Sequence, residues 1–117
     1  MPDNQNCVFC KIINGEIPSK KVYEDDRIIA FHDIAPNAPV HVLVIPKEHI
    51  PSLNHVSDEN SEILSDIMVL IPQIAKKLGV YESGYRVIVN CGSDSGMMVE
   101  HLHFHILGGC PLPEKLA

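Results

Sequence analysis

The sequence predicts one small domain built from both β-strands and helices. Its 117 residues suit a single domain. Five segments are rich in β-branched residues or alternate polar with apolar side chains, which is typical of strands. One segment, residues 57–78, instead repeats its apolar residues with helical spacing.

The expected strands are short and bounded by turn residues. The run 24–27, Glu-Asp-Asp-Arg, suits a hairpin turn, and the loop 33–39 contains two prolines. No repeat or low-complexity linker is visible in the chain. The strands are predicted at residues 21–23, 28–31, 40–45, 85–90 and 101–107.

Two helices are expected. A short helix covers residues 7–14, and a long helix covers residues 57–78 with Ser57 as its N-cap. Pro72 lies inside the long helix, where it removes one hydrogen bond and crowds the preceding turn at a cost of ~3 kcal/mol. We therefore expect a kink or break near residues 68–72.

The composition excludes several classes of function. The net charge is −6, with only 9 Lys and Arg residues, whereas a protein that binds nucleic-acid polymers needs a basic face. No apolar run is long enough to cross a membrane. The first six residues show no secretory signal, so we expect a cytoplasmic protein with no membrane partner.

Three histidines alternate with apolar residues in the run His101-Leu102-His103-Phe104-His105. On a strand this spacing places three imidazoles on one face. Three interpretations are open: a solvent-exposed face of an edge strand, a metal site, or phosphoryl chemistry with an imidazole nucleophile. The spacing alone does not separate the last two.

A Cys-x-x-Cys pair, Cys7 and Cys10, has the spacing of half a zinc site or of a redox dithiol. A redox dithiol of the thioredoxin type needs a strand before the pair and a helix after it. Only six residues precede Cys7, which disfavours this interpretation. A zinc site would need two further ligands from elsewhere in the chain.

Together these motifs resemble the Hint branch of the histidine triad (HIT) family. The resemblance covers about residues 7–109, with tails at 1–6 and 110–117, and makes the whole chain one HIT domain. It implies an α+β fold with an antiparallel sheet of about five strands, one long helix and a short N-terminal helix. It also implies a homodimer whose sheets join edge to edge. The matching motifs are Phe9-x-x-Ile12-Ile13, Phe31-His32-Asp33-Ile34-x-Pro36, Pro39-x-His41-x-Leu43-Val44-Ile45-Pro46-Lys47, Gly84-Tyr85-Arg86, Asn90-x-Gly92-Ser93-Asp94 and His101-x-His103-x-His105-x-x-Gly108-Gly109.

The same resemblance implies an activity, the hydrolysis of purine nucleoside phosphoramidates or related nucleotidyl conjugates. His103 would be the nucleophile that forms a nucleotidyl-histidine, and His105 and His41 would hold phosphoryl oxygens. Asp33 would bind the ribose hydroxyls. The other implied substrate contacts are Asn90, the backbone of Gly96, Met98 and Val99, and an apolar slot for the base formed by Phe9, Ile12, Phe31 and Ile34.

The resemblance also implies a structural zinc ion bound by Cys7, Cys10, His49 and His101, and no organic cofactor. One feature departs from the family: Met97 and Met98 stand where members commonly carry Gln followed by Ser, Thr or Glu. A thioether donates no hydrogen bond to a leaving group. A nucleotide-binding regulatory protein with weak residual activity is therefore one alternative. A three-histidine zinc hydrolase, from another class of protein, is the other.

Overall fold

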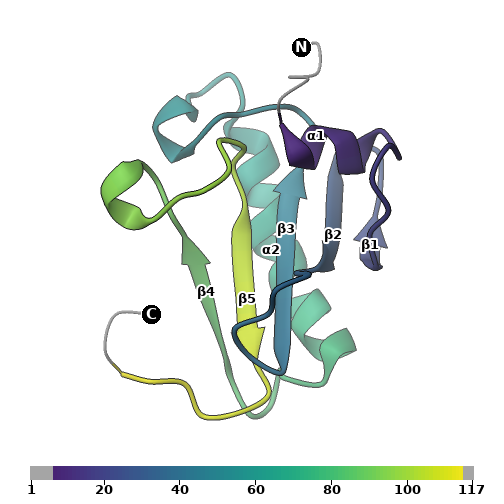
Figure 1. Ribbon diagram of the computed structural model, residues 1–117, viewed down its shortest axis with the longest axis vertical. Helices are drawn as coiled ribbons and strands as arrows, with labels where there is room; N and C mark the ends of the chain where they lie inside the picture. The colour runs from purple at the N-terminus through teal and green to yellow at the C-terminus, as the bar shows by residue number, and fades with distance from the viewer. Residues whose placement is uncertain (1–6, 115–117) are drawn as a thin grey trace.

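The computed structural model describes residues 7–114, which form a five-stranded antiparallel sheet and two α-helices (Figure 1). The strand order is β1-β2-β3-β5-β4, so β1 and β4 are the edges of the sheet. The predicted α+β fold with an antiparallel sheet is confirmed. The strands are β1 (Lys21–Glu24), β2 (Ile28–His32), β3 (Val40–Pro46), β4 (Tyr85–Val89) and β5 (Phe104–Gly108).

The register of β3, β5 and β4 aligns their residues in rows that run across the sheet. Leu107 of β5 lies opposite His41 of β3 and also opposite Arg86 of β4. His105 lies in the same way between Leu43 and Ile88. Each row therefore crosses from β3 through β5 to the edge strand.

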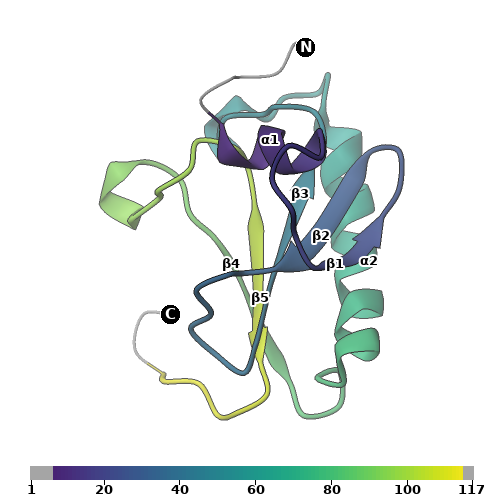
Figure 2. The same ribbon diagram turned by 45° about the vertical axis from the view of Figure 1, so that its right-hand side comes forward.

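The long helix α2 (Ser61–Leu78) packs along one face of the sheet, as Figure 2 shows. Its buried residues, among them Ile67 and Ile74, contact the alternate residues Val42 and Val44 of β3 in the main core. The helix continues through Pro72, so the predicted break is absent. Burial of this apolar face against the sheet offsets the hydrogen bond that proline removes.

The start of α2 differs from the prediction. The helix begins at Ser61 with Asn60 as its N-cap, four residues after the predicted start. Ser57 instead stabilises the turn that precedes the helix, because its Oγ accepts a hydrogen bond from the backbone N–H of Glu59 at 3.3 Å. The Asn60 side chain closes this turn by accepting from the backbone N–H of Ser57 at 2.8 Å.

The short helix α1 (Val8–Ile13) covers one end of the opposite face of the sheet (Figures 1 and 2). Phe9 and Ile12 pack there against Phe31 and Leu43 in a second apolar cluster. Among the described residues, no helix is long and apolar enough to cross a membrane.

Candidate active site and adjoining cysteine–histidine cluster

The three alternating histidines enter different environments. Strand β5 begins at Phe104, so the predicted strand start at residue 101 is wrong, and only His105 of the three lies within the strand. The side chains still alternate: Leu102 and Phe104 are buried in the main core, as expected. His101 and His103 are also buried, and each ring makes hydrogen bonds that offset its desolvation.

His103 is held in one tautomer. Its Nδ1 lies 2.6 Å from the carbonyl oxygen of His101, and because a carbonyl only accepts, Nδ1 must carry the proton and donate. In the neutral ring the lone pair is then on Nε2. Burial lowers the pKa of His103 and favours this neutral form. The rings of Phe9 and His103 pack in a T-shaped arrangement, with centroids 5.0 Å apart.

His41 and His105 form a second ordered pair. The backbone N–H of Asn37 donates to His41 Nδ1 at 3.1 Å, which places the proton of the neutral ring on Nε2. His41 Nε2 in turn lies 2.9 Å from His105 Nδ1 and donates to it. The proton of His105 is therefore on Nε2, a buried atom with no hydrogen-bond partner in the described structure. This N–H is available to an acceptor such as a phosphoryl oxygen.

Burial keeps both rings of this pair neutral. It lowers the pKa of His105 to about 4, with His103 and His41 adding to the effect, and it lowers the pKa of His41. The carboxylate of Asp33, 3.5 Å from His41 Nε2, opposes the shift in both rings. At pH 7 the pair consequently acts as a chain of neutral hydrogen-bond donors.

Asp33, His41 and His105 bring their ligand atoms within 4.8 Å of one another, a spacing that also suits a metal ion. The Asn37 N–H argues against that use, because it keeps the proton on His41 Nε2, the atom that a metal would have to bind. The three alternating histidines do not make a shared site either, since His101 turns toward α1. The geometry disfavours a three-histidine zinc hydrolase.

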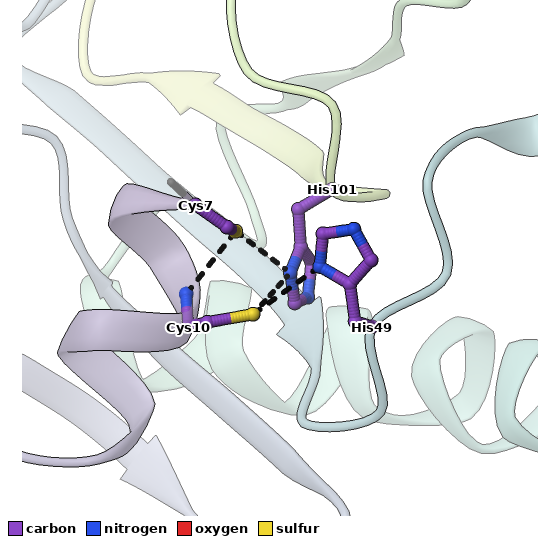
Figure 3. Close-up of side chains that lie close together, drawn as sticks. All are labelled: Cys7, Cys10, His49 and His101. Atoms are coloured by element: carbon purple, nitrogen blue, oxygen red, sulfur yellow. Dashed lines mark hydrogen bonds between the residues drawn. The ribbon is translucent and has the colours of Figure 1, made fainter. Parts of the chain in front are cut away.

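Figure 3 shows a separate cluster in which Cys7, Cys10, His49 and His101 face one another. The sulfur of Cys7 lies 3.4 Å from His101 Nδ1, and that of Cys10 lies 3.2 Å from His49 Nδ1. All four side chains are buried, and their ligand atoms lie within 4.8 Å of one another. The structure therefore brings together the four residues that were predicted as zinc ligands.

The donor set of this cluster fits a tetrahedral zinc ion. Zinc bonds of about 2.3 Å to sulfur and about 2.0 Å to nitrogen place neighbouring ligand atoms roughly 3.5 Å apart, close to the observed separations. His101 Nε2 lies 2.8 Å from the carbonyl oxygen of Pro46 and donates to it, which leaves the Nδ1 lone pair facing the sulfurs.

The predicted substrate contacts do not all lie together in the structure. Phe9, Ile12 and Phe31 are buried side by side in the second apolar cluster, whereas Ile34 is 97% exposed. Met98 is 92% exposed. Of the remaining predicted contacts, Asn90 lines a cavity, Gly96 ends a 3₁₀ turn with φ +84°, and Val99 packs against the second apolar cluster.

Two cavities meet at His41. The first, about 620 Å³, lies beside Asp33 and Ile34 and is called the Asp33 cavity below. The second, about 380 Å³, is the Arg86 cavity. It is lined by Asn37, His41, Arg86, Ile88, Asn90, Ser95, His105, Leu107, Leu112 and Pro113.

Sequence reasoning assigned no role to Asn37 or Arg86. Asn37 acts through its backbone N–H, which no side-chain pattern indicates. Arg86, Ile88 and Asn90 are spaced two residues apart, so a strand places them on one face. The position of Arg86 on the same face as Asn90, a predicted substrate contact, was the available signal. It becomes informative only when the register shows that Arg86 faces the row of His41 and Leu107.

The antiparallel sheet and the histidines of β3 and β5 define a histidine triad protein. The chain belongs to the HIT domain family, whose model matches residues 14–112.

Relatives and solved structures agree over nearly the whole length. A purine nucleoside phosphoramidase of Escherichia coli K12 is 45% identical over 113 residues, which are 97% of this chain and 95% of the relative. A histidine triad protein from Clostridium difficile is 54% identical with a TM-score of 0.93, covering 98% of this chain and 100% of that one. A HIT family hydrolase from Clostridium thermocellum is 50% identical with a TM-score of 0.95 and the same coverage.

Proposed function

We propose that this protein hydrolyses purine nucleoside phosphoramidates or related nucleotidyl conjugates through a covalent intermediate on His103. The observation that carries the proposal is the hydrogen bond from His103 Nδ1 to the His101 carbonyl, because it leaves Nε2 as a free nucleophile. The relatives named as a phosphoramidase and as a hydrolase support the same reaction class.

In the first step, His103 Nε2 attacks the α-phosphorus and forms a P–N bond. The bond from phosphorus to the amine breaks, and the amine takes up a proton from water. The Nε2–H of His105 donates to a phosphoryl oxygen, where negative charge increases in the transition state. The relay from Asn37 through His41 keeps this donor in the required tautomer.

In the second step, water attacks the phosphorus and the bond to His103 Nε2 breaks. The nucleoside monophosphate leaves, and the imidazole returns to its neutral form. The nucleoside occupies the Asp33 cavity, where the carboxylate of Asp33 accepts hydrogen bonds from the ribose hydroxyls and Ile34 contacts the base. Asn90 and the backbone of residues 96–99 supply further donors to the phosphate.

The experiment that tests this proposal is mass spectrometry of the protein mixed with a slowly cleaved adenosine phosphoramidate. We expect a nucleotidyl adduct on His103, and loss of hydrolysis in His103→Ala. The control is His55→Ala, which removes an exposed histidine and should keep full activity. A His103→Ala enzyme with kcat within about tenfold of wild type, a difference of 1.4 kcal/mol, would contradict the proposal.

A regulatory nucleotide-binding protein with weak hydrolysis is the second candidate, and the methionines favour it. Met97 and Met98 provide no side-chain proton for the leaving amine, which removes one source of rate enhancement. Substrate binding would be unaffected, since the hydrogen-bond donors of the site come from His105 and the backbone. Tight nucleotide binding with very slow turnover would favour this candidate.

We also propose that Cys7, Cys10, His49 and His101 bind one structural zinc ion. The short sulfur–nitrogen distances, the burial of all four residues and the fixed tautomer of His101 support this assignment. The ion would join α1 to the loops that precede β5 and follow β3. It would not contact the substrate.

Finally, we infer a cytoplasmic homodimer. The edge strand β4 leaves one side of its backbone available for pairing, and Val87 on this strand is 37% exposed. Reduced cysteines in a zinc site suit a reducing compartment. No binding to nucleic-acid polymers is expected from a chain with a net charge of −6.

A further inference from the structure

We propose that Arg86 is a specificity-determining residue of the Arg86 cavity, where it selects leaving amines that carry a carboxylate. The inference deepens the proposed hydrolysis and rests on it. It concerns only the part of the substrate that departs, and therefore makes no claim about the nucleoside.

The direction of in-line displacement leads to this cavity. The nucleophile and the leaving group lie on opposite sides of the phosphorus. Same-face side chains along an extended chain are about 7 Å apart, so His103, His105 and Leu107 follow one another in a line. A leaving group on the side of the phosphorus opposite His103 would lie toward His105 and Leu107, which both line the Arg86 cavity.

The two cavities, which both include His41 in their lining, would bind different parts of the substrate. The Asp33 cavity contains a carboxylate, which suits hydroxyl groups and repels an anion. The described residues that line the Arg86 cavity include no acidic side chain. An anionic leaving group would therefore be accommodated only on the Arg86 side.

Among the described residues that line this cavity, Arg86 carries the single formal charge. The two lining histidines, His41 and His105, are neutral at pH 7 because burial lowers the pKa of each. The remaining lining residues are uncharged, and Ile88, Leu107 and Leu112 make much of the surface apolar. An anion that enters this cavity is therefore attracted by one positive charge that no lining carboxylate opposes.

The guanidinium is held in place without being neutralised. One of its nitrogens, Nη2, donates to the carbonyl oxygen of Pro113 at 2.6 Å, which also holds Leu112 over the cavity. Within residues 7–114, no carboxylate lies in ion-pair distance of Arg86. The other N–H groups of the guanidinium, which have no partner within the described part of the chain, could donate to the two oxygens of a carboxylate.

The distance explains why Arg86 would bind the leaving group rather than the α-phosphate. Arg86 and His41 are two strands apart in one row, which places their Cα atoms about 10 Å from each other. An anion several bonds beyond the departing nitrogen falls within this span. Amino acids with a short spacer between amine and carboxylate meet the requirement.

The test uses two adenosine phosphoramidates that differ only in charge. One carries 3-aminopropanoate as its leaving amine, and the other carries 3-aminopropanamide, which has nearly the same shape. We expect wild type to favour the carboxylate in kcat/KM by about tenfold, equivalent to roughly 1.4 kcal/mol, mainly through KM. In Arg86→Gln this ratio should fall to near one.

Two further variants make the result specific. Arg86→Lys keeps the positive charge but loses the planar group that donates two parallel hydrogen bonds. It should retain part of the preference for the carboxylate substrate. Arg27→Gln removes the other arginine of the chain, on the surface near α2, and should keep the wild-type ratio. The inference is overturned if wild type shows no preference, or if Arg86→Gln keeps it while both amines are still cleaved. Failure to cleave either substrate, with no adduct on His103, would instead overturn the proposed function and the inference together.

Discussion

The carbonyl oxygen of His101 lies 2.6 Å from Nδ1 of His103, so a residue of the cysteine–histidine cluster orients the candidate nucleophile. The His101 ring faces the two cysteines, while its backbone sets the tautomer of His103. Phe9, between the two cysteines in the chain, packs on the rings of both histidines. Order in the cluster and order at His103 are therefore physically connected.

The first prediction concerns zinc. Protein purified without chelator should contain close to one zinc per chain, and Cys7→Ser combined with Cys10→Ser should lose the metal and melt at a lower temperature. Metal analysis and thermal unfolding measure these changes. Cys91→Ser with Cys110→Ser is the matched control, since both residues lie outside the cluster. A stable wild-type protein without metal, with Cys7 and Cys10 freely titratable, would refute the site.

The connection through His101 adds a consequence to this prediction. Metal loss should lower kcat for the phosphoramidate, because Phe9 and the His101 carbonyl would no longer be held against His103. Readdition of zinc to protein stripped of metal should restore both the melting temperature and kcat. If stability recovers with kcat constant throughout, the cluster is structural only.

The second prediction concerns Met98, an exposed residue that the family resemblance places among the substrate contacts and that supplies no donor. Met98→Ser should raise kcat by about fivefold, the worth of one hydrogen bond of ~1 kcal/mol, with the largest gain for poor leaving amines. Steady-state kinetics over a series of amines measures the effect. Met68→Ser, at an exposed methionine of α2, is the control. If Met98→Ser and wild type cleave every amine of the series at the same rate, the side chain at position 98 takes no part in the reaction.

The third prediction concerns pH and stability. His105 has a pKa of about 4 in the folded protein against 6.5 as its ordinary value, because burial, His103 and His41 disfavour the charged ring and outweigh the carboxylate of Asp33. Between these pH values the unfolded chain binds more protons, so stability falls as pH decreases from 6.5 toward 4.

His105→Gln removes this contribution. Between pH 7 and pH 5, its free energy of unfolding should fall less than that of wild type, by roughly 1 kcal/mol after allowance for partial exposure. Denaturant titrations at the two pH values measure the difference, with His55→Gln as the matched variant. A variant with the same pH dependence as wild type would show that His105 is not buried as a neutral ring.

The fourth prediction concerns assembly. At micromolar concentration, sedimentation should give roughly twice the chain mass of 13.0 kDa. Val87→Lys should shift the protein toward monomer, because an edge lysine disfavours strand pairing. Val69→Lys, at an exposed valine of α2, should leave the dimer intact. A wild-type monomer would contradict the edge-to-edge model.

The sequence by itself determined the elements and the main chemistry. Alternation placed Leu102, Phe104 and Ile106 in the core, and helical spacing located α2 to within four residues at its start. These patterns are local, since each records which side of an element faces the core. Motif spacing paired Cys7 with Cys10, and the family resemblance added two histidines far away in the chain.

Only the tertiary structure decided the surroundings and the tautomers of the histidines. Strand pairing set the row of His41, Leu107 and Arg86, and folding brought the Asn37 N–H to His41 and the His101 ring to the cysteines. It also separated Phe9 and Phe31, which are buried, from Ile34, which is exposed, although the resemblance assigned all three to one apolar slot. Tautomers, cavities and unpaired charges depend on contacts between residues that are distant in the chain, and no local pattern encodes such contacts.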